Sequence, residues 1–448
     1  MILIIIAGIS VLLGLIYKPD WVAVFLFTLI ISGINIETNL LPINLKAIVT
    51  IALFLRILFD HNKNVTYPSF LSSGNIRLLL IFWLYAVLIS ADQGLLTFEL
   101  AKRVLSLVLS AYCAYHFFYV KQNSDALKTA VILSGLICFA DLVYTYKEFG
   151  TFPVQRVYLL FTGQEQEVDP DDIYEAEVNH NFYGEITGLA FVFILNEIIK
   201  NKKSSRYMML FLPLMLMGVF MSTSRSSLLA LIIVSILLIF NGLRKMEYRK
   251  KVYKIGSFAL AAGVVGILLF STIGKYFKLD NKFADEVVFR LAEEPMAIIQ
   301  RAMGYNYDVQ NLGSMDWREE ASSDAFAAYT NLEISEQMKG IGQGGFMERN
   351  LGKGLNPHNG ILLILIEAGL VGLTIYLILM SSVIIQAAKA RVFSASFAVV
   401  GFILIYGIGQ NFEITSTTMF LFVATLIAET NFKRTALEGQ NHFMKLSG

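Results

Sequence analysis

The chain has 448 residues, of which 56% are hydrophobic and only 16% are charged. Soluble domains carry about 25% charged residues, so this composition excludes an ordinary water-soluble enzyme, a nucleic-acid-binding protein and a disordered scaffold. The net charge is +1, and any electrostatic recognition must therefore come from local clusters. Apolar stretches of membrane-spanning length recur along the whole chain, which predicts a polytopic membrane protein.

Continuous apolar runs predict membrane helices, because a segment in lipid must satisfy its own backbone hydrogen bonds. The first two runs are short and are separated by Lys18-Pro19-Asp20. They form either a hairpin or one bent element, so we expect an all-α fold with about 12 or 13 transmembrane helices. Residues 1–17 lack the basic start and cleavage site of a signal peptide, and we expect them to remain in the membrane. The predicted helices cover residues 2–17, 21–34, 43–59, 78–91, 104–120, 129–146, 182–199, 208–221, 228–240, 255–272, 360–385, 394–409 and 414–428.

Short basic loops predict the orientation, because such loops stay in the cytoplasm. They lie at 200–206, 244–254 and 389–391, and Lys433 and Arg434 mark the tail. Strict alternation then places outside the acidic segment 147–181, the turn 222–227 and the long segment 273–359. The expected organisation is an N-terminal set of helices over 1–272, a long outer loop over 273–359, and C-terminal helices with a cytoplasmic tail over 360–448.

The long outer segment far exceeds the usual length of a connection. Its sequence predicts helices over 284–303 and 317–338, followed by the glycine-rich stretch 340–345. That stretch is not a phosphate-binding loop, because it neither follows a strand nor contains the necessary lysine. We expect it to be a flexible return to the membrane.

The turn Ser222-Thr223-Ser224-Arg225-Ser226-Ser227 joins two apolar runs at the predicted outer face. An arginine here is costly unless it reaches water or an anion. Arg225 is therefore either a snorkelling interfacial side chain or a phosphate ligand, whose planar donors match two phosphate oxygens. The hydroxyl groups around it would add neutral hydrogen bonds.

The motif Pro357-His358-Asn359-Gly360 ends the long segment just before an apolar helix. A neutral imidazole can accept a proton from an attacking hydroxyl, and a charged one can donate to a phosphate. A lone histidine is equally often structural. Glu367 lies roughly 180° around the helix from His358, which argues against a dyad of the two.

Further polar residues at the predicted outer face are weaker candidates. Lys102 and Arg103 lie outside against the usual charge bias, so either the early topology is wrong or, as we favour, the pair meets an anionic headgroup. Asparagine and histidine before a helix can simply cap it, and an exposed ion pair of Arg318 with the glutamates after it would contribute little. Asp141 and Glu185 lie in or near predicted membrane helices, where ionisable groups usually have a role. The other candidates at this face are Asn179, His180, Asn181, Arg156, Arg301 and Arg318.

Taken together, the motifs resemble the O-antigen ligase and polymerase family of bacterial surface-polysaccharide enzymes. Their order and spacing match over about residues 179–385. Related sequences often have an arginine two or three residues before the tryptophan, where this chain has Ser314 and Met315, and Arg318 or Arg301 is the candidate replacement. The matching pieces are Asn179-His180-Asn181 with Gly184, residues 222–226, Trp317-Arg318, and residues 339–346, 358–362 and 367–373.

The resemblance implies an all-helical membrane enzyme, similar to C-type glycosyltransferases, at the outer face of the bacterial inner membrane. Such enzymes transfer a glycan from an undecaprenyl diphosphate carrier to an acceptor hydroxyl, with no metal and no other cofactor. The leaving lipid diphosphate gains negative charge, which fixed cations stabilise. The implied catalytic residues are His358 and Arg225. The implied diphosphate ligands are Arg225, Lys102, Arg103, Arg318 and Arg301. The implied acceptor or glycan ligands are Asn179, His180, Asn181, Asn359 and Arg156.

Two versions of this function compete. A ligase transfers the polymer to a lipid or glycan acceptor, whereas a polymerase transfers it to the next carrier-linked repeat. We favour the ligase, because the histidine motif and the single long loop resemble that branch more closely. From a different class, a flippase or transporter for lipid-linked glycans would also need many helices, but the chain shows no internal repeat of the kind expected there.

Overall fold

In the computed structural model, the protein is a bundle of helices. In its described part there is no strand, and five helices (α4, α6, α7, α10 and α17) are long and apolar enough to cross a membrane. The fold is therefore all-α and polytopic, as the composition predicts. The structure describes residues 14, 17–32, 45–60, 74–95, 98–117, 124–149, 180–200, 205–222, 224–244, 248–250, 252–254, 313–351, 357, 359–389 and 395–409.

The N-terminal helices fall where the apolar runs predict them, with ends that differ by a few residues. They are α2 (Pro19–Ile31), α3 (Leu45–Asp60), α4 (Gly74–Asp92), α5 (Phe98–Tyr115), α6 (Ser124–Phe149) and α7 (His180–Lys200). Pro19 begins α2, where the missing N–H costs nothing. Nearly all of the predicted helix 2–17 lies outside the described residues.

The C-terminal helices show three departures from the predicted pattern. The predicted helix 208–221 is two helices, the predicted helix 317–338 is interrupted at residues 331–333, and the predicted helix 360–385 is broken at Gly369. The predicted helices 255–272, 284–303 and 414–428 lie outside the described residues. The helices are α8 (Ser205–Met209), α9 (Phe211–Met221), α10 (Arg225–Arg244), α14 (Gly313–Thr330), α15 (Ile334–Lys339), α16 (Gly345–Glu348), α17 (Gly360–Lys389) and α18 (Ala395–Gly409).

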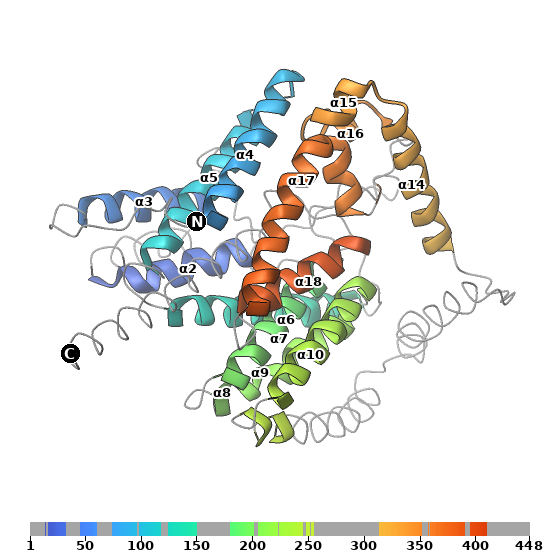
Figure 1. Cartoon of the computed structure of the whole chain (residues 1–448). Coiled ribbons are helices and arrows are strands. Elements are labelled where there is room, and N and C mark those ends of the chain that lie inside the picture. Colours follow the sequence, from blue (N-terminus) through green and yellow to red (C-terminus); the bar gives the residue numbers. More distant parts are fainter. Residues whose placement is uncertain are drawn as a thin grey trace, which may run out of the picture.

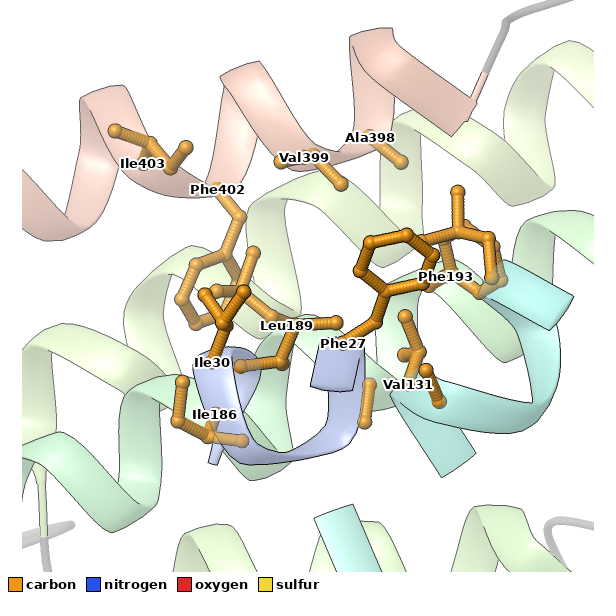
Figure 2. Packing of buried hydrophobic residues seen from close by; sticks show 14 of the residues in the cluster. Phe27, Ile30, Val131, Ile186, Leu189, Phe193, Ala398, Val399, Phe402 and Ile403 are labelled. Atoms are coloured by element: carbon orange, nitrogen blue, oxygen red, sulfur yellow. The ribbon is translucent and has the colours of Figure 1, made fainter. Parts of the chain in front are cut away.

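Helix α7 is the central helix of the bundle (Figure 1). Its apolar span is 89% buried, and α6, α9, α10 and α18 pack around it. Figure 2 shows Ile186, Leu189 and Phe193 of α7 against side chains of α2, α6 and α18, among them Phe27 and Phe402. The start of α7 is thus fixed by the packing of the whole bundle.

Small residues allow these helices to approach closely, as is common between membrane helices. A β-carbon at Gly188 would lie 2.6 Å from the ring of Phe402 on α18, and one at Gly218 would lie 2.7 Å from Thr187 on α7. A β-carbon at Gly135 would meet Met215 on α9. These glycines therefore fix α6, α9 and α18 in one register along α7.

Polar side chains within the bundle have partners on neighbouring helices. Lys128 of α6 pairs with Glu197 near the end of α7 at 3.4 Å. Towards the other end of α7, the hydroxyl of Tyr183 lies 3.5 Å from the carboxylate of Asp141. Helix α6 therefore runs antiparallel to α7, and an ionisable group of α6 contacts α7 near each end of the pair.

Basic residues gather where α7 and α10 end. Lys200 ends α7, and Arg244 ends α10 with its guanidinium 5.1 Å from the ring centre of Phe240. Residues Arg249, Lys250 and Lys254, just beyond α10, are exposed. We call this region the basic end of the bundle. By contrast, α10 and α4 carry exposed apolar side chains along their length, such as Ile236 and Leu84, as lipid-facing helices do.

Candidate functional site

The turn before α10 lies against the start of α7. A β-carbon at Gly184 would lie 2.4 Å from Ser222 Oγ, 2.7 Å from Ser224 Cβ and 3.0 Å from Ser227 Oγ. We call residues 222 and 224–227 the serine turn. The structure therefore brings together two motifs, one beginning at Asn179 and one at Ser222, that are distant in the sequence.

The hydroxyl groups of these serines form hydrogen bonds within the turn and to the end of α9. Ser222, Ser224 and Ser227 are buried, and Ser222 Oγ donates to the carbonyl of Val219 at 2.8 Å. The hydroxyl groups of Ser224 and Ser227 lie 2.8 Å apart, and the N–H of Ser227 donates to Ser224 Oγ at 3.4 Å. Ser224 is thus the N-terminal cap of α10. These three hydroxyls therefore form hydrogen bonds that build the turn itself.

Arg225 is the first residue of α10 and the cation of the serine turn. Its side chain is partly exposed, while its Nη1 atom is buried. A helix start carries a partial positive charge that adds to the charge of a cation placed there. The guanidinium and the helix start therefore both favour the binding of an anion at this position.

Helices α18 and α6 contact the first turns of α7. Asn181 in the first turn of α7 is buried, and its carbonyl accepts a hydrogen bond from the hydroxyl of Tyr406 on α18 at 3.4 Å. Glu185, one turn further along α7, is also buried, as is Asp141 of α6. Tyr406 and Tyr183 were not predicted as parts of this region, because aromatic residues within apolar runs do not stand out in the sequence.

The second group of motifs meets at the break in α17. Gly369 has φ 66° and ψ −176°, a conformation essentially restricted to glycine. The helical segment 360–368 ends there, and its last carbonyls lose their partners within the helix. The N–H groups of Ile341 and Gly342 donate to the carbonyls of Ile366 and Glu367 at 3.2 and 2.9 Å.

We call residues 340–345 the glycine loop. Gly340, Gly342 and Gly344 have positive φ values of 88°, 87° and 81°, which bend the backbone so that successive N–H groups point at partners. The N–H of Gly344 donates to the carboxylate of Glu367 at 2.9 Å. The expectation of a flexible connection is therefore wrong: this stretch is a tight, hydrogen-bonded turn on the broken helix.

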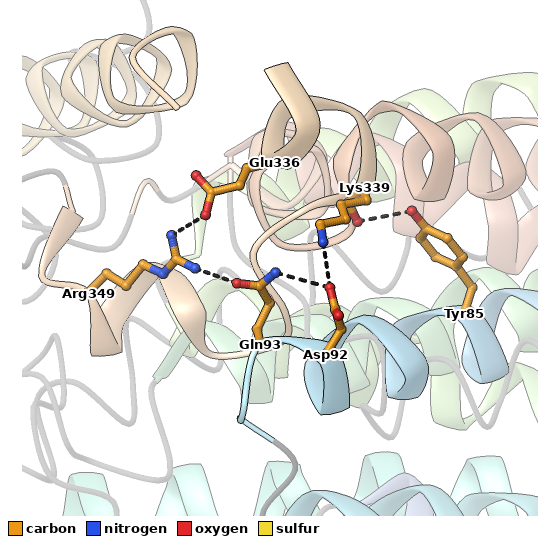
Figure 3. Close-up of polar contacts among 6 residues, drawn as sticks. All are labelled: Tyr85, Asp92, Gln93, Glu336, Lys339 and Arg349. Atoms are coloured by element: carbon orange, nitrogen blue, oxygen red, sulfur yellow. Dashed lines mark hydrogen bonds and ion pairs between the residues drawn. The ribbon is translucent and has the colours of Figure 1, made fainter. Parts of the chain in front are cut away.

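The glycine loop also contacts the end of α4, and Figure 3 shows the contacts that the flanking residues Lys339 and Arg349 make there. The N–H of Gln343 donates to Ser90 Oγ at 2.9 Å, and the hydroxyl of Tyr85 donates to the carbonyl of Lys339 at 2.9 Å. Lys339 forms an ion pair with Asp92. These contacts join residues more than 240 positions apart, and nothing in the sequence predicts them.

Arg349 adds a further link between the long segment and α4. Its guanidinium donates to Glu336 at 2.8 Å and to the side-chain oxygen of Gln93 at 2.6 Å (Figure 3). Helix α5, whose second turn includes Lys102 and Arg103, begins shortly after Gln93. The backbone positions of this basic pair therefore follow directly on the end of α4 that holds the glycine loop.

The histidine motif is fixed on both sides of His358. Asn359 Oδ1 accepts hydrogen bonds from the N–H groups of Ile361 and Leu362, each at 3.1 Å, and so caps α17. Ser322 of α14 donates to the carbonyl of Pro357 at 2.8 Å. Asn359 therefore has a structural role as a cap, and α14 holds the residue just before His358.

A small apolar cluster joins α14, the glycine loop, α16 and α17. It consists of Ala325, Ile341, Phe346 and Ile366, all fully buried. Arg318 lies on α14 four residues before Ser322, which places both positions on one face of that helix. The long segment thus has its own core next to the broken helix.

The remaining predicted site residues are placed only in part. His180 begins α7, and Lys102, Arg103 and Arg318 lie within helices. Among the described residues, no group of three or more His, Cys, Asp or Glu side chains lies close enough together to hold a metal ion. His358, Asn179, Arg156 and Arg301 lie outside the described residues.

The fold and these two groups of contacts define a class of protein: a polytopic α-helical membrane protein in which the serine turn carries an arginine and a long segment is docked on the helices. Residues 210–377 match the family model described as O-antigen ligase. This match confirms the resemblance to the O-antigen ligase and polymerase family that the motifs predict. The matched range contains the serine turn, the glycine loop and the break in α17. No curated protein matches the chain in sequence.

Proposed function

We propose that the protein transfers a glycan from an undecaprenyl diphosphate carrier to an acceptor hydroxyl at the outer face of the bacterial inner membrane. The observation that carries this proposal is the position of Arg225. It is a partly buried cation at the start of α10, inside the matched family range, in a turn whose serines pack against Gly184 of the central helix.

The chemistry requires a fixed positive charge where the carrier leaves. The acceptor oxygen forms a bond to the anomeric carbon of the sugar, and the bond from that carbon to the diphosphate oxygen breaks. The lipid diphosphate departs with the electron pair. A guanidinium with parallel donors at a helix start stabilises this charge.

We assign the remaining roles by their motifs. His358 accepts the proton of the attacking hydroxyl or donates to the diphosphate. Lys102 and Arg103 assist at the diphosphate, as does Arg318 or Arg301. Asn179, His180, Asn181 and Arg156 bind glycan or acceptor. Because Asn359 caps α17 through its side-chain oxygen, only its amide nitrogen is available for a ligand.

The charge distribution supports the proposed orientation. The basic end of the bundle, at Lys200 and Arg244, lies at the opposite ends of α7 and α10 from the serine turn. Since basic ends of membrane helices face the cytoplasm, the serine turn faces outward. The active site then lies between the long segment and the outer ends of the helices.

Within this function, we favour the ligase reaction over the polymerase reaction. Both need the same diphosphate site and differ in the acceptor. The long segment docked on α4 and α17 through the glycine loop is a large outer structure suited to a bulky acceptor. A transporter for lipid-linked glycans is the alternative from another class.

The test is transfer from a carrier-linked glycan in proteoliposomes, with a panel of acceptors. Arg225→Ala and His358→Ala are compared with the wild type, with and without a chelator. Arg244→Ala is the matched control, because it removes an exposed arginine at the other end of the same helix. We expect Arg225→Ala to lower transfer by about 100-fold or more, the scale of losing a charge stabiliser in a transition state, and Arg244→Ala to leave it unchanged.

The acceptor identifies the reaction. Transfer to a lipid or glycan acceptor indicates a ligase, whereas elongation of the glycan on its carrier indicates a polymerase. Full transfer in both Arg225→Ala and His358→Ala refutes the proposed site. Movement of the carrier lipid across the bilayer without any transfer favours the transporter.

A further inference from the structure

The helical segment 360–368 is held at both ends by other parts of the long segment. At its start, Asn359 caps the helix and Ser322 holds the carbonyl of Pro357. At its end, the glycine loop supplies the N–H groups that the carbonyls of residues 366 and 367 require. A helix of this length spans roughly 13 Å. It is a rigid link between the glycine loop and the residues around position 358.

The side chain of Glu367 contributes to the contact between the glycine loop and the end of the helical segment 360–368. Glu367 is almost fully buried, and its carboxylate accepts the N–H of Gly344 at 2.9 Å. Backbone hydrogen bonds from the N–H groups of Ile341 and Gly342 also join the glycine loop to α17. Glu367 is thus the position where a side-chain substitution loosens this contact.

The glycine loop in turn is attached to α4. Ser90 accepts the N–H of Gln343, the neighbour of Gly344, and a β-carbon at Gly342 would lie 3.1 Å from the backbone of Ser90. A shift of the loop relative to α17 therefore changes how the segment 360–368 sits relative to the membrane helices. Through that rigid segment, the shift reaches residues 357–359.

We propose that Glu367 is a positioning residue, which fixes the glycine loop on the broken helix α17 and thereby fixes Pro357 and Asn359, the neighbours of His358 in the sequence, relative to α4 and α14. This rests on the proposed function, in which His358 acts on the substrates. Glu367 takes no part in the proton transfer. Its carboxylate is bound to Gly344 at the opposite end of the segment from His358.

The test compares three substitutions in the full-length protein in lipid nanodiscs. Glu367→Gln keeps an oxygen that accepts the N–H of Gly344. Glu367→Asp keeps the charge but shortens the side chain by one methylene, so that the carboxylate no longer reaches the N–H of Gly344. Glu367→Ala removes the group. Glu336→Gln is the matched control, because Glu336 lies in the same outer segment and pairs with Arg349 rather than with α17.

Hydrogen exchange is the first readout and does not depend on any substrate. We expect Glu367→Asp and Glu367→Ala to raise exchange at the amides of residues 341–345 and 359–362. Glu367→Gln and Glu336→Gln should leave residues 359–362 as in the wild type. Faster exchange at 341–345 with unchanged exchange at 359–362 overturns the coupling between the two ends.

Transfer kinetics are the second readout. A misplaced reacting group lowers the rate steeply. We therefore expect kcat to fall by about 10- to 100-fold in Glu367→Asp and Glu367→Ala, with the KM for the donor little changed. Glu367→Gln should keep the kcat of the wild type. Loss of activity in Glu367→Gln with normal exchange overturns the proposal, because the charge itself would then be needed. If the wild type transfers no glycan, the proposed function fails, while hydrogen exchange still decides the role of Glu367.

Discussion

Gly184 of α7 and Ser222 before α10 are in contact so close that a β-carbon at position 184 would lie 2.4 Å from the serine hydroxyl. The same β-carbon would meet Ser224 and Ser227. The three serines are bonded within the turn and have little room to move. The absence of a side chain on α7 is therefore what allows the serine turn, and with it Arg225, to lie on the central helix.

Gly184→Ala is expected to destabilise the protein and to displace Arg225. Overpacking of a filled contact typically costs about 1–3 kcal/mol. Thermal unfolding in detergent measures the loss, and transfer activity should fall with it. Gly74→Ala is the control, because a β-carbon at Gly74 meets nothing within 4 Å. Equal stability of the two variants would contradict the close packing of the serine turn on α7.

Gly369→Ala is expected to destabilise the protein more than Gly184→Ala does. The backbone at Gly369 has φ 66° and ψ −176°, which costs an alanine about 1–3 kcal/mol. The added methyl group would also lie 2.4 Å from the N–H nitrogen of Gly340 and the carbonyl oxygen of Met338. We expect a lower unfolding temperature and faster hydrogen exchange in the glycine loop.

The control for Gly369 is Gly401→Ala on α18. A β-carbon there makes an ordinary contact of 3.4 Å with Val234, so stability should change little. A Gly369→Ala variant with unchanged stability and an intact glycine loop would contradict the requirement for glycine at this position.

Lys128 and Glu197 allow a test of the packing between α6 and α7. Their side chains are 17% and 11% exposed, and Lys128 also pairs with Asp125 at 3.0 Å. Lys128→Met leaves the Glu197 carboxylate without its lysine, whereas Glu197→Gln leaves Lys128 with Asp125. We therefore expect Lys128→Met to cost more, about 1–3 kcal/mol, because removing one partner of a largely buried pair is expensive.

The double variant Lys128→Met with Glu197→Leu should recover much of that loss, because well-packed apolar residues often replace such a pair without cost. Thermal unfolding of the wild type, Lys128→Met, Glu197→Leu and the double variant gives the coupling energy. Additive losses would show that the two side chains do not interact in the membrane.

The sequence predicts most helices of this protein but not the contacts that organise its outer part. Apolar runs define α4, α7 and α10, because a membrane helix needs a continuous stretch of apolar residues. The break in α17 was missed, because Gly369 stands within a strongly apolar run and glycine is tolerated in membrane helices. Its distinctive feature, a positive φ that exposes carbonyls for the glycine loop, is a property of the backbone.

The candidate site was predicted in a similarly uneven way. Arg225 stood out, because a cation between two apolar runs requires an explanation, and the structure places it at a helix start. The serines beside it were expected to add neutral hydrogen bonds to a ligand, and the structure shows a structural role for two of them: Ser224 caps α10 and Ser222 packs against Gly184. Capping and ligand binding use the same residue types, so composition alone does not distinguish them.

The contacts between α4 and the long segment predict how hydrogen exchange in that segment depends on the salt concentration. Lys339 and Asp92 are 40% and 53% exposed, and exposed ion pairs contribute little and are screened by salt. The hydrogen bond from Tyr85 to the carbonyl of Lys339 is partly buried, and removing it should cost about 1 kcal/mol. We therefore expect Tyr85→Phe to loosen residues 339–343 more than Lys339→Met does.

Hydrogen exchange of residues 339–345 at low and at high salt separates the two contributions. The effect of Lys339→Met should shrink as the salt concentration rises, because screening already weakens the pair in the wild type. The effect of Tyr85→Phe should persist, because a neutral, partly buried hydrogen bond is not screened. If Lys339→Met released the segment at every salt concentration, the ion pair, rather than Tyr85 and Ser90, would hold the glycine loop on α4.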